Sequence, residues 1–294
     1  MRVVVTGREG QVVQSLLTRA ARHPEIDIVP LGRPDLDLTD LGRIAPAIAD
    51  ARPDILISAA AYTSVDKAED EPGLAYRVNA EAPAELARAA RLVGAPIIHL
   101  STDYVFDGAS ERPYRENDPT SPISTYGRSK LAGEVAVRAA QPDHLILRTA
   151  WVYSPFGRNF VKSMLRSAQI SERVAVVDDQ HGNPTSAFDV TDALLLIVDR
   201  WRQGGDRAMG TYHFAGTGET TWCGLAHETF SISRRLGGPF VEVDAITTAE
   251  FAAKAARPVN SSLDCGRFAD AFGHRAPAWQ SSLAVVVRSL LQPR

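Results

Sequence analysis

The chain has 294 residues, of which 45% are hydrophobic and 23% charged, and its formal net charge is -3. This length allows one large domain or two modest ones around a sizeable core, and the composition is ordinary for a soluble globular protein. The small negative charge gives no reason to expect nucleic acid or an anionic membrane as a partner. No apolar run is long enough to span a bilayer, and the N-terminus enters a strand rather than a signal peptide.

The two cysteines and seven histidines form no cluster with the spacing of metal ligands. Cys223 and Cys265 fit reduced thiols better than a disulfide framework, which favours a cytoplasmic protein. No pair of histidines stands in a spacing such as H-E-x-x-H. From these patterns we predict no catalytic metal.

The first half of the chain alternates short β-branched runs with longer helical patterns. In chain order we expect a strand at Val3–Val5, a helix at Val12–Ala21, a strand at Ile26–Leu31, a helix at Ile44–Ala51, a strand at Ile55–Ser58, a helix at Pro83–Val93, a strand at Ile97–Ser101, a helix at Ser124–Ala140 and a strand at Leu145–Arg148. Apolar strands separated by helices predict a parallel sheet covered on both faces, which is a doubly wound, Rossmann-type α/β fold.

Beyond about residue 150 the alternation becomes less regular. We expect strands at Val174–Val177 and Thr211–Phe214, and helices at Val190–Trp201 and Thr221–Leu236. Glycine and proline separate these elements, as is typical of turns. Residues 151–294 therefore predict a smaller C-terminal α/β region, some of whose segments return to the sheet.

Polar and glycine-containing segments follow the strands of the first half, where ligands of such sheets bind. These segments are Gly7 and Gly10 after the first strand, Ala59–Thr63 after the third, Ser101–Tyr104 after the fourth and Thr149–Trp151 after the fifth. Because the carboxyl ends of parallel strands meet at one edge, we expect these segments to form one site.

The turn after the first strand has the spacing Gly7-x-x-Gly10-x-x-Val13. Glycines at such a turn let the backbone approach a pyrophosphate, which the helix N-terminus then stabilises. A third glycine would normally allow close packing of helix on strand, so Val13 predicts a helix slightly farther from the sheet. A plain tight turn is the alternative. The pattern favours an NAD(P)-binding domain over residues 1–150 and a mainly substrate-binding domain over residues 151–294.

The end of the second strand bears on the choice of dinucleotide. An acidic residue there would favour NAD through its ribose hydroxyls. The chain instead carries Arg33, whose guanidinium could bind a 2′-phosphate, although Asp35 could equally bind the ribose. The sequence favours NADPH and leaves NADH open.

Tyr126 and Lys130 are spaced to share one face of a helix, which by itself usually indicates a surface pair. A free phenol has a pKa of about 10, and a neighbouring ammonium stabilises the phenolate and lowers that pKa. Such a phenol can protonate the alkoxide formed when a hydride reaches a ketone. Thr102 is placed to orient the substrate oxygen, while Asp103 could contact the substrate or merely cap a turn.

Several short motifs occur in one order along residues 3 to about 263. They are Ala59–Glu69 (AAAYTSVDKAE), Ser101–Gly108 (STDYVFDG), Tyr126–Glu134 (YGRSKLAGE), Arg148–Tyr153 (RTAWVY), Asp179–Thr185 (DQHGNPT) and Arg257–Leu263 (RPVNSSL). Together they resemble the extended short-chain dehydrogenase/reductases and, more narrowly, the dTDP-4-dehydrorhamnose reductase family.

The resemblance implies a reductase that uses NADPH to reduce the C4 ketone of dTDP-4-dehydro-L-rhamnose to dTDP-L-rhamnose. It implies that Tyr126 is the proton donor, that Lys130 is its partner and a ribose ligand, and that Thr102 assists. The cofactor residues that it implies are Gly7, Arg8, Glu9, Gly10 and Gln11 at the pyrophosphate, Asp37 and Leu38 beside the adenine, and Ala61, Tyr62 and Thr63 along the dinucleotide.

The resemblance also implies a nucleotide-sugar site. Thr102, Asp103, Tyr104 and Trp151 would contact the substrate, and Asp179–Thr185 would shape its pocket. A core aromatic is the alternative for Trp151.

Some members of the family bind Mg²⁺ through glutamates at a dimer interface. The matching positions here are Ser15 and Phe188, neither of which is a plausible ligand. We therefore predict no such metal site and leave a homodimer open.

Two rival functions remain. The first is another sugar-nucleotide enzyme of the same superfamily, which would be a different reductase, an epimerase or a dehydratase. A dehydratase would carry an Asp-Glu pair beside the threonine, whereas Thr102 is followed by Asp103 and Tyr104. The second is a non-catalytic, dinucleotide-binding regulatory subunit, against which the intact Thr102, Tyr126 and Lys130 argue.

Overall fold

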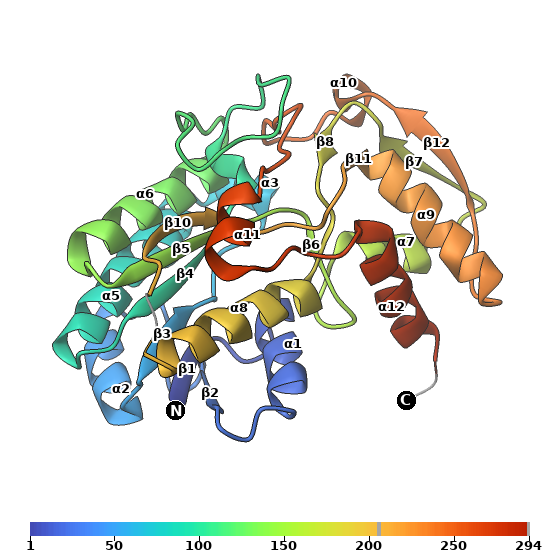
Figure 1. Cartoon of the computed structure of the whole chain (residues 1–294). Helices are drawn as coiled ribbons and strands as arrows, with labels where there is room; N and C mark the ends of the chain where they lie inside the picture. The colour runs from blue at the N-terminus through green and yellow to red at the C-terminus, as the bar shows by residue number, and fades with distance from the viewer. Residues whose placement is uncertain (205–206, 293–294) are drawn as a thin grey trace.

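A six-stranded parallel sheet lies at the centre of the larger part of the molecule (Figure 1). The computed structural model describes residues 1–204 and 207–292. The strand order is β10-β5-β4-β3-β1-β2. The strands are β1 (Arg2–Thr6), β2 (Asp27–Leu31), β3 (Ile55–Ser58), β4 (Ile97–Thr102), β5 (His144–Thr149) and β10 (Gly210–His213). This arrangement confirms the predicted doubly wound α/β fold.

Helices cover both faces of the sheet because alternate strand residues point to opposite sides. Val3 and Val5 of β1 are buried with α1 (Gln11–Ala20), α8 (Ala187–Arg202) and α11 (Gly266–Phe272). The intervening Val4 is buried on the opposite face, which is covered by α2 (Ile44–Ala51), α5 (Ala82–Leu92) and α6 (Thr125–Ala140). Burial on both faces explains why these strands read as continuous apolar runs.

The predicted helix Pro83–Val93 is the last part of a longer helical segment. It is preceded by α3 (Val65–Asp70), α4 (Pro72–Tyr76) and the π-helix η2 (Arg77–Glu81). Pro83 suggested a helix start because proline favours the first turn, but here the chain is already helical before it. The wide π-turn immediately precedes this proline.

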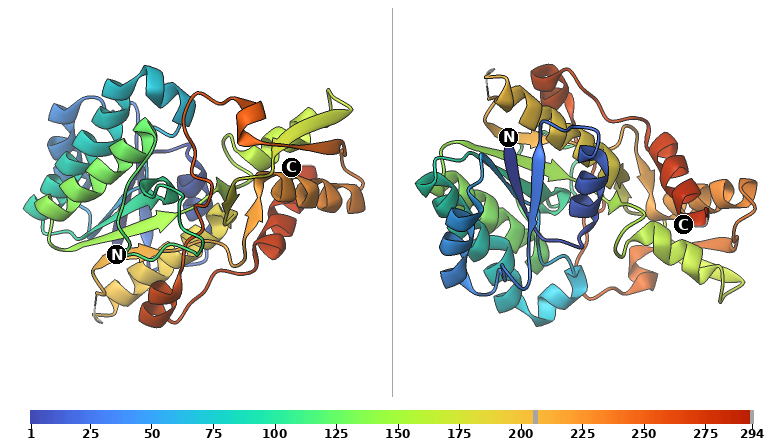
Figure 2. Two further views of the ribbon diagram at one scale, coloured as in Figure 1. Left: turned by 90° about the horizontal axis from the view of Figure 1, so that it is seen from above. Right: turned by 90° about the horizontal axis from the view of Figure 1, so that it is seen from below.

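The C-terminal part contains three two-stranded sheets packed with helices, on the right of Figure 1. Its elements are β6 (Val152–Tyr153), α7 (Phe160–Ser167), β7 (Arg173–Val177), β8 (His181–Gly182), β9 (Thr185–Ser186), β11 (Thr220–Thr221), α9 (Trp222–Arg235), β12 (Glu242–Ile246), α10 (Thr248–Phe251) and α12 (Trp279–Leu291). Two short 3-10 helices, η1 (Leu41–Arg43) and η3 (Asp103–Val105), belong to the larger part. The views in Figure 2 show this smaller part beside the carboxyl ends of the sheet strands.

Two predicted elements of the second half belong to the larger part of the molecule: one is a strand of its sheet and the other is a helix that covers the sheet. The predicted strand Thr211–Phe214 corresponds to β10, which pairs in parallel with β5, and the predicted helix Val190–Trp201 lies within α8. The connection that contains α8 supplies the crossover that a parallel neighbour requires.

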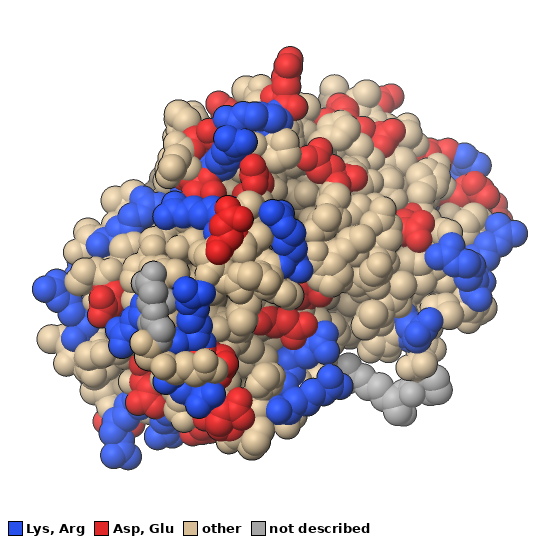
Figure 3. All heavy atoms as spheres, in the orientation of Figure 1, with Lys and Arg blue, Asp and Glu red and all other residues tan. Residues whose placement is uncertain are grey.

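One face of the molecule, drawn in Figure 3, shows no strong separation of charge. Basic and acidic side chains are intermingled on the face drawn in Figure 3, in keeping with the net charge of -3. Within residues 1–204 and 207–292, none of the helices combines the length and the apolar character needed to cross a bilayer.

Candidate active site

A cavity of about 800 Å³ opens at the carboxyl ends of the parallel strands. Most of the predicted site residues line it, namely Gly7, Glu9, Gly10, Gln11, Ala61, Thr63, Thr102, Asp103, Tyr104, Tyr126, Lys130 and Trp151. The remaining ones, Arg8, Arg33, Asp37, Leu38 and Tyr62, lie outside its lining. Segments that are far apart in the sequence thus meet at the edge where the sequence places a ligand.

The turn after β1 is shaped to approach a ligand. Gly7 has φ +99°, and its N–H donates to the Leu31 carbonyl at 2.8 Å. Gly10 precedes α1 without a side-chain cap, and nothing lies within 4 Å of where its Cβ would be. The N-terminus of α1 is therefore open, and its backbone N–H groups suit a phosphate. The structure thus fits the dinucleotide pyrophosphate that the sequence predicts.

Val13 packs closely in the core beneath this turn. Its side chain is buried, and its Cγ2 lies 3.6 Å from the position of a Cβ on Gly7. This is an ordinary van der Waals distance, so the positive φ of residue 7, and not the space beside Val13, is what favours glycine there. Whether α1 lies farther from the sheet than in relatives stays a prediction.

Gln11 joins the glycine turn to the C-terminal part. Its Nε2 donates to the Val152 carbonyl at 3.2 Å, and its Oε1 accepts from Ser154 Oγ and Asn159 Nδ2, each at 2.9 Å. The side chain therefore fixes the turn against the segment after β5.

At the end of β2, Arg8 forms an ion pair with Asp35. The Cγ of Arg8 lies 3.2 Å from the position of a Cβ on Gly32, so this glycine lets the arginine lie across the strand end. Asp37 accepts from the backbone N–H and the hydroxyl of Thr39, and the backbone bond is the main cause that lowers its pKa. Both acids at this end are already paired within the chain.

Tyr126 and Lys130 lie on the face of α6 that meets β4. The Ser124 hydroxyl caps this helix by accepting from Gly127 N–H at 3.1 Å, which places Tyr126 in the first turn. Lys130 Nζ donates to the Leu100 carbonyl at 2.7 Å, and the Thr102 hydroxyl is near enough to the Tyr126 phenol to stabilise its phenolate. The three predicted catalytic side chains therefore meet at the carboxyl end of β4.

Burial determines the proton affinity of both groups. It raises the pKa of Tyr126 to about 12, against the opposing hydrogen bond from Thr102, and it lowers the pKa of Lys130 to about 8. The expectation that Lys130 lowers the pKa of Tyr126 is therefore wrong for the chain alone, because desolvation of the phenolate is the larger effect. A tyrosine with this pKa keeps its proton at neutral pH, as a proton donor must.

Asp103 is buried beside these groups. Desolvation raises its pKa to about 6, while the nearby hydroxyls of Ser261 and Thr102 oppose the shift. Thr102 Oγ1 donates to Oδ1 at 2.8 Å, but Oδ2 has no hydrogen-bond partner within 3.5 Å in the described part of the chain, because the Ser261 hydroxyl near it donates to the His181 carbonyl. Thr102, and not Asp103, caps the following turn η3.

Trp151 is both buried and part of the cavity wall. Its backbone has φ +46°, and its ring stacks on Trp222 with centroids 3.7 Å apart. A Cβ on Gly182 would lie 2.5 Å from the indole, so only glycine leaves room for this ring. The segment Asp179–Thr185 therefore does not line the cavity but supports the indole from behind.

Several residues of the cavity carried no separate prediction. Trp222, Lys67 and Arg158 also line it. Lys67 lies within a motif quoted for the resemblance, whereas Trp222 and Arg158 gave no local signal. Arg257 lies farther out, where it is hydrogen-bonded to Tyr104.

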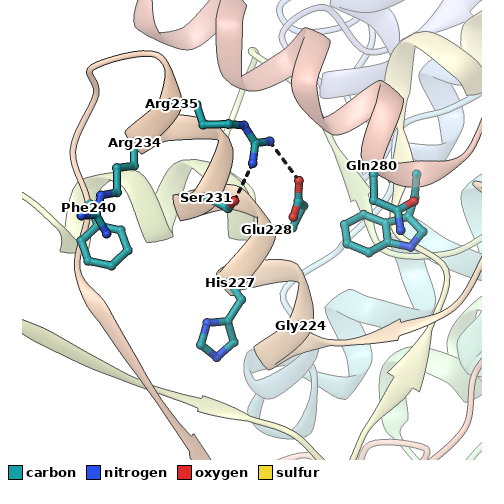
Figure 4. A pocket seen from close by; sticks show the side chains of 9 residues that line it. Gly224, His227, Glu228, Ser231, Arg234, Arg235, Phe240 and Gln280 are labelled. Carbon is teal, nitrogen blue, oxygen red and sulfur yellow. Dashed lines mark hydrogen bonds and ion pairs between the residues drawn. The ribbon is translucent and has the colours of Figure 1, made fainter.

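A second cavity, of about 710 Å³, lies on the outer side of α9 and contains none of the predicted site residues (Figure 4). Its polar groups mostly pair with one another. Arg235 bonds to Ser231 at 2.7 Å and to Glu228 at 3.3 Å, and the Arg234 guanidinium lies 5.0 Å from the ring centroid of Phe240. We assign no function to this cavity.

The positions that match the interface metal of some relatives do not suit a cation. Ser15 is buried in α1, and the Phe188 ring faces the Arg19 guanidinium at 4.8 Å. In the described residues, no three His, Cys, Asp or Glu side chains are grouped to hold a metal ion.

Comparison with known proteins identifies the family. The family described as the RmlD substrate binding domain matches residues 1–292. A dTDP-4-dehydrorhamnose reductase of Sinorhizobium fredii is 47% identical over 292 residues, which cover 99% of this chain and 98% of the relative.

Two solved structures share the fold over nearly the whole chain. One is a dTDP-4-dehydrorhamnose reductase from Clostridium acetobutylicum, with a TM-score of 0.92 and 36% identity over 99% of this chain and 100% of that one. The other is the Bacillus anthracis enzyme in complex with NADP, with a TM-score of 0.90 and 36% identity over 98% of this chain and 99% of that one. Sequence and fold agree that the chain belongs to the dTDP-4-dehydrorhamnose reductase family.

Proposed function

We propose that the chain is an NADPH-dependent reductase that converts the C4 ketone of dTDP-4-dehydro-L-rhamnose to the hydroxyl of dTDP-L-rhamnose. The observation that carries this proposal is the meeting of Tyr126, Thr102 and Lys130 in one cavity with the glycine turn after β1. A protonated phenol, a neighbouring hydroxyl and an open helix N-terminus are the groups that a ketone reduction with a dinucleotide requires.

When bound, NADPH supplies the hydride that adds to the carbonyl carbon. In the proposed mechanism, Thr102 and Tyr126 hold the carbonyl oxygen by hydrogen bonds, which orients the ketone and polarises it. Tyr126 gives its proton to that oxygen as the carbon–oxygen double bond becomes single. The resulting phenolate is close to Lys130 on α6 and is reprotonated from solvent. This sequence leaves the alcohol and the oxidised dinucleotide, so protons and electrons balance.

The proposed cofactor residues divide between the two ends of the dinucleotide. Gly7, Glu9, Gly10 and Gln11 would surround the pyrophosphate, and Ala61, Tyr62 and Thr63 would contact the dinucleotide after β3. Asp37 and Leu38 would lie beside the adenine. The NADP in the Bacillus anthracis relative supports NADPH.

The 2′-phosphate would lie at the end of β2. Arg33 is exposed there. Arg8 lies against Gly32, the residue that precedes Arg33 in the sequence. The pairing of Asp35 with Arg8 supports a phosphate contact over a ribose contact for this end, because an acid paired with an arginine repels a phosphate less. NADH remains the alternative.

The proposed substrate site adds groups from both parts of the chain. Asp103, Tyr104 and Trp151 would contact the sugar, and Lys67 and Arg158 are the cations of the cavity that suit a diphosphate. We propose that residues 1–150 bind the dinucleotide and that residues 151–294 mainly bind the nucleotide sugar. Within the second range, β10 and α8 are part of the dinucleotide-binding fold, as a strand of the large sheet and a helix packed on it. The homodimer and the cytoplasmic location stay predictions.

Purified protein mixed with NADPH and dTDP-4-dehydro-L-rhamnose should oxidise the dinucleotide, followed as absorbance at the nicotinamide band. Tyr126→Phe should lower the rate by about 100-fold or more while the affinity for NADPH stays near that of the wild type. Tyr76→Phe, outside the cavity on α4, is the matched control. The absence of oxidation that depends on the sugar would refute the reductase, and a wild-type rate for Tyr126→Phe would refute the proton donor.

The same assay separates the rivals. A regulatory subunit would bind NADPH without consuming it, and an epimerase or dehydratase would convert its sugar nucleotide without net oxidation of NADPH. The Thr102-Asp103-Tyr104 sequence, which lacks an Asp-Glu pair, favours the reductase over a dehydratase.

A further inference from the structure

Behind Lys130, a charged cluster is enclosed between α6, β4 and β5. Glu134 is fully buried and Arg148 is 2% exposed. Glu134 Oε1 accepts from Ser101 Oγ at 2.6 Å and from Arg148 Nε at 2.8 Å, and its Oε2 accepts from Nη2 of Arg148 at 2.7 Å and of Arg138 at 2.9 Å. Every oxygen of this carboxylate has two donors, although none of the steps proposed above uses it.

Such a cluster is not explained by stability alone. Replacing a buried ion pair by apolar side chains of similar volume is often neutral or stabilising. A fully satisfied polar network instead fixes one arrangement of the elements that it joins. The elements joined here carry the proposed catalytic groups.

The cluster adds to the contacts between α6 and β4. Lys130 donates to the Leu100 carbonyl, the Ser101 hydroxyl donates to Glu134, and the Tyr126 phenol lies near the Thr102 hydroxyl. The three helix residues stand about one helical turn apart. Glu134 thus fixes the register in which Tyr126 meets Thr102.

Glu134 also acts on Lys130 electrostatically. Burial lowers the pKa of Lys130, and Glu134 is the group that opposes this shift. His99 faces Lys130 from β4, and both burial and Lys130 keep its pKa well below the usual value. His213 from β10 lies behind Arg148, and burial lowers its pKa to about 3. Both histidines are therefore neutral at the working pH, and the carboxylate of Glu134 is the counter-charge.

We propose that Glu134, held by Arg148, is a positioning residue that sets the register of α6 on β4 and keeps Lys130 protonated at neutral pH. The proposal rests on the proposed function, in which Lys130 binds the ribose of the dinucleotide. A protonated lysine donates up to three hydrogen bonds and carries a charge, whereas the neutral amine binds its partners more weakly.

The test measures the dissociation constant of NADPH, by nicotinamide fluorescence, from about pH 6 to about pH 9, the range that brackets the loss of a proton from Lys130. In the wild type, the affinity should fall as the pH rises through the pKa of Lys130. In Glu134→Gln, the same fall should begin about one pH unit lower, which makes the affinity about tenfold weaker than that of the wild type at pH values above both transitions. Glu134→Asp retains the charge and should keep the wild-type transition.

Further variants complete the experiment. Glu228→Gln removes the acid of an ion pair on α9 and should not move the transition. If Glu134→Gln does not fold, the double variant Glu134→Gln/Arg148→Met is compared with Arg148→Met alone. The two proteins differ only in the charge at position 134, so the transition of the double variant should lie at the lower pH. A folded variant without a carboxylate at position 134 whose transition matches that of the protein with which it is compared would overturn the proposal.

The outcomes also distinguish this inference from the proposed function. A wild type that binds NADPH but does not reduce the nucleotide sugar would refute only the proposed reaction. A wild type that does not bind NADPH would refute both.

Discussion

Burial, rather than pairing of opposite charges, controls the ionisable residues of the cavity. Desolvation raises the pKa values of Tyr126 and Asp103 and lowers that of Lys130. These shifts keep the phenol protonated at neutral pH and bring the pKa of Lys130 down to about 8, within reach of neutral pH. The charge on Lys130 is therefore sensitive to its surroundings, which is why a buried carboxylate one turn away matters.

Asp103 gives a prediction about pH and stability. Its pKa is about 6 in the folded chain and about 3.8 when unfolded, so the folded state binds more protons between these values. Stability should therefore fall as the pH rises from about 4 to about 6 and stay at the lower value above, at a cost of roughly 3 kcal/mol. Asp103→Asn should remove this fall and raise stability at pH 7 by about 1–3 kcal/mol.

Urea unfolding of the two proteins at several pH values measures this difference. The control is Asp50→Asn, which changes an exposed acid at the end of α2. In this variant the free energy of unfolding should fall between about pH 4 and about pH 6 by as much as in the wild type. A wild-type pH dependence in Asp103→Asn would show that another group is responsible.

Among the elements, α6 depends on two glycines for its close approach to its neighbours. A Cβ on Gly127 would lie 2.2 Å from the Tyr104 carbonyl oxygen, and one on Gly133 would lie 2.1 Å from that of Asn79. Backbone cannot yield as a flexible side chain can, so any substitution must move the helix. These contacts set the height of Tyr126 and Lys130 above β4.

Gly133→Ala should therefore lower the free energy of unfolding by about 1–3 kcal/mol, because the added methyl group pushes α6 away from η2. Gly73→Ala is the matched control, since nothing lies within 4 Å of its Cβ in α4. Alanine is the better helix former, so this change should be neutral or stabilise by up to about 1 kcal/mol. Equal losses in both variants, measured by urea unfolding, would contradict the account of α6 packing.

The sequence predicts best those elements whose signals are local. The strands β1, β3, β4 and β5 are continuous apolar runs, and Ser124 marks the start of α6, so these elements are correctly predicted within one or two residues. Tyr126, Lys130 and Thr102 were recognisable because each lies at an element end in a short motif. The strand β12 was missed because its sequence, EVDAI, is half-polar and none of its residues is buried, so only its pairing with β7 defines it.

The same reason explains the residues that the sequence did not reveal. Trp222 reaches Trp151 across 71 positions of the chain only after the C-terminal part has folded. Arg8 could not be paired with Asp35 from a motif, since the contact depends on how β2 lies beside β1. Lastly, the pKa of Tyr126 depends on desolvation, which a spacing of Tyr and Lys does not report.

At the scale of the whole molecule, one segment of the C-terminal part is tied to α3 of the larger part. Arg257 bonds to Asp66 at 2.7 Å, the N–H of Ala255 donates to the same carboxylate at 3.0 Å, and Lys254 forms an ion pair with Asp70. Because α3 carries Val65 and Lys67 of the cavity wall, these contacts connect the position of the C-terminal part to the shape of the site.

Arg257→Met should therefore affect the nucleotide sugar more than the dinucleotide. The methionine keeps much of the side-chain volume but loses the bonds to Asp66 and to the Tyr104 hydroxyl, so we expect a loss of about 1–2 kcal/mol in the free energy of unfolding. The KM for the sugar should rise about tenfold, because the wall that α3 forms with Tyr104 is no longer held, while the dissociation constant of NADPH stays within about twofold.

Arg173→Met is the control, since the ion pair of Arg173 with Asp244 joins two strands of the C-terminal part and is exposed. Exposed pairs contribute little, so neither stability nor KM should change measurably. Steady-state kinetics and urea unfolding of both variants decide the matter. If Arg257→Met leaves the KM for the sugar at its wild-type value, the ties to α3 contribute to stability but do not shape the site, and the cavity must be held by the segment after β5 through Gln11 instead.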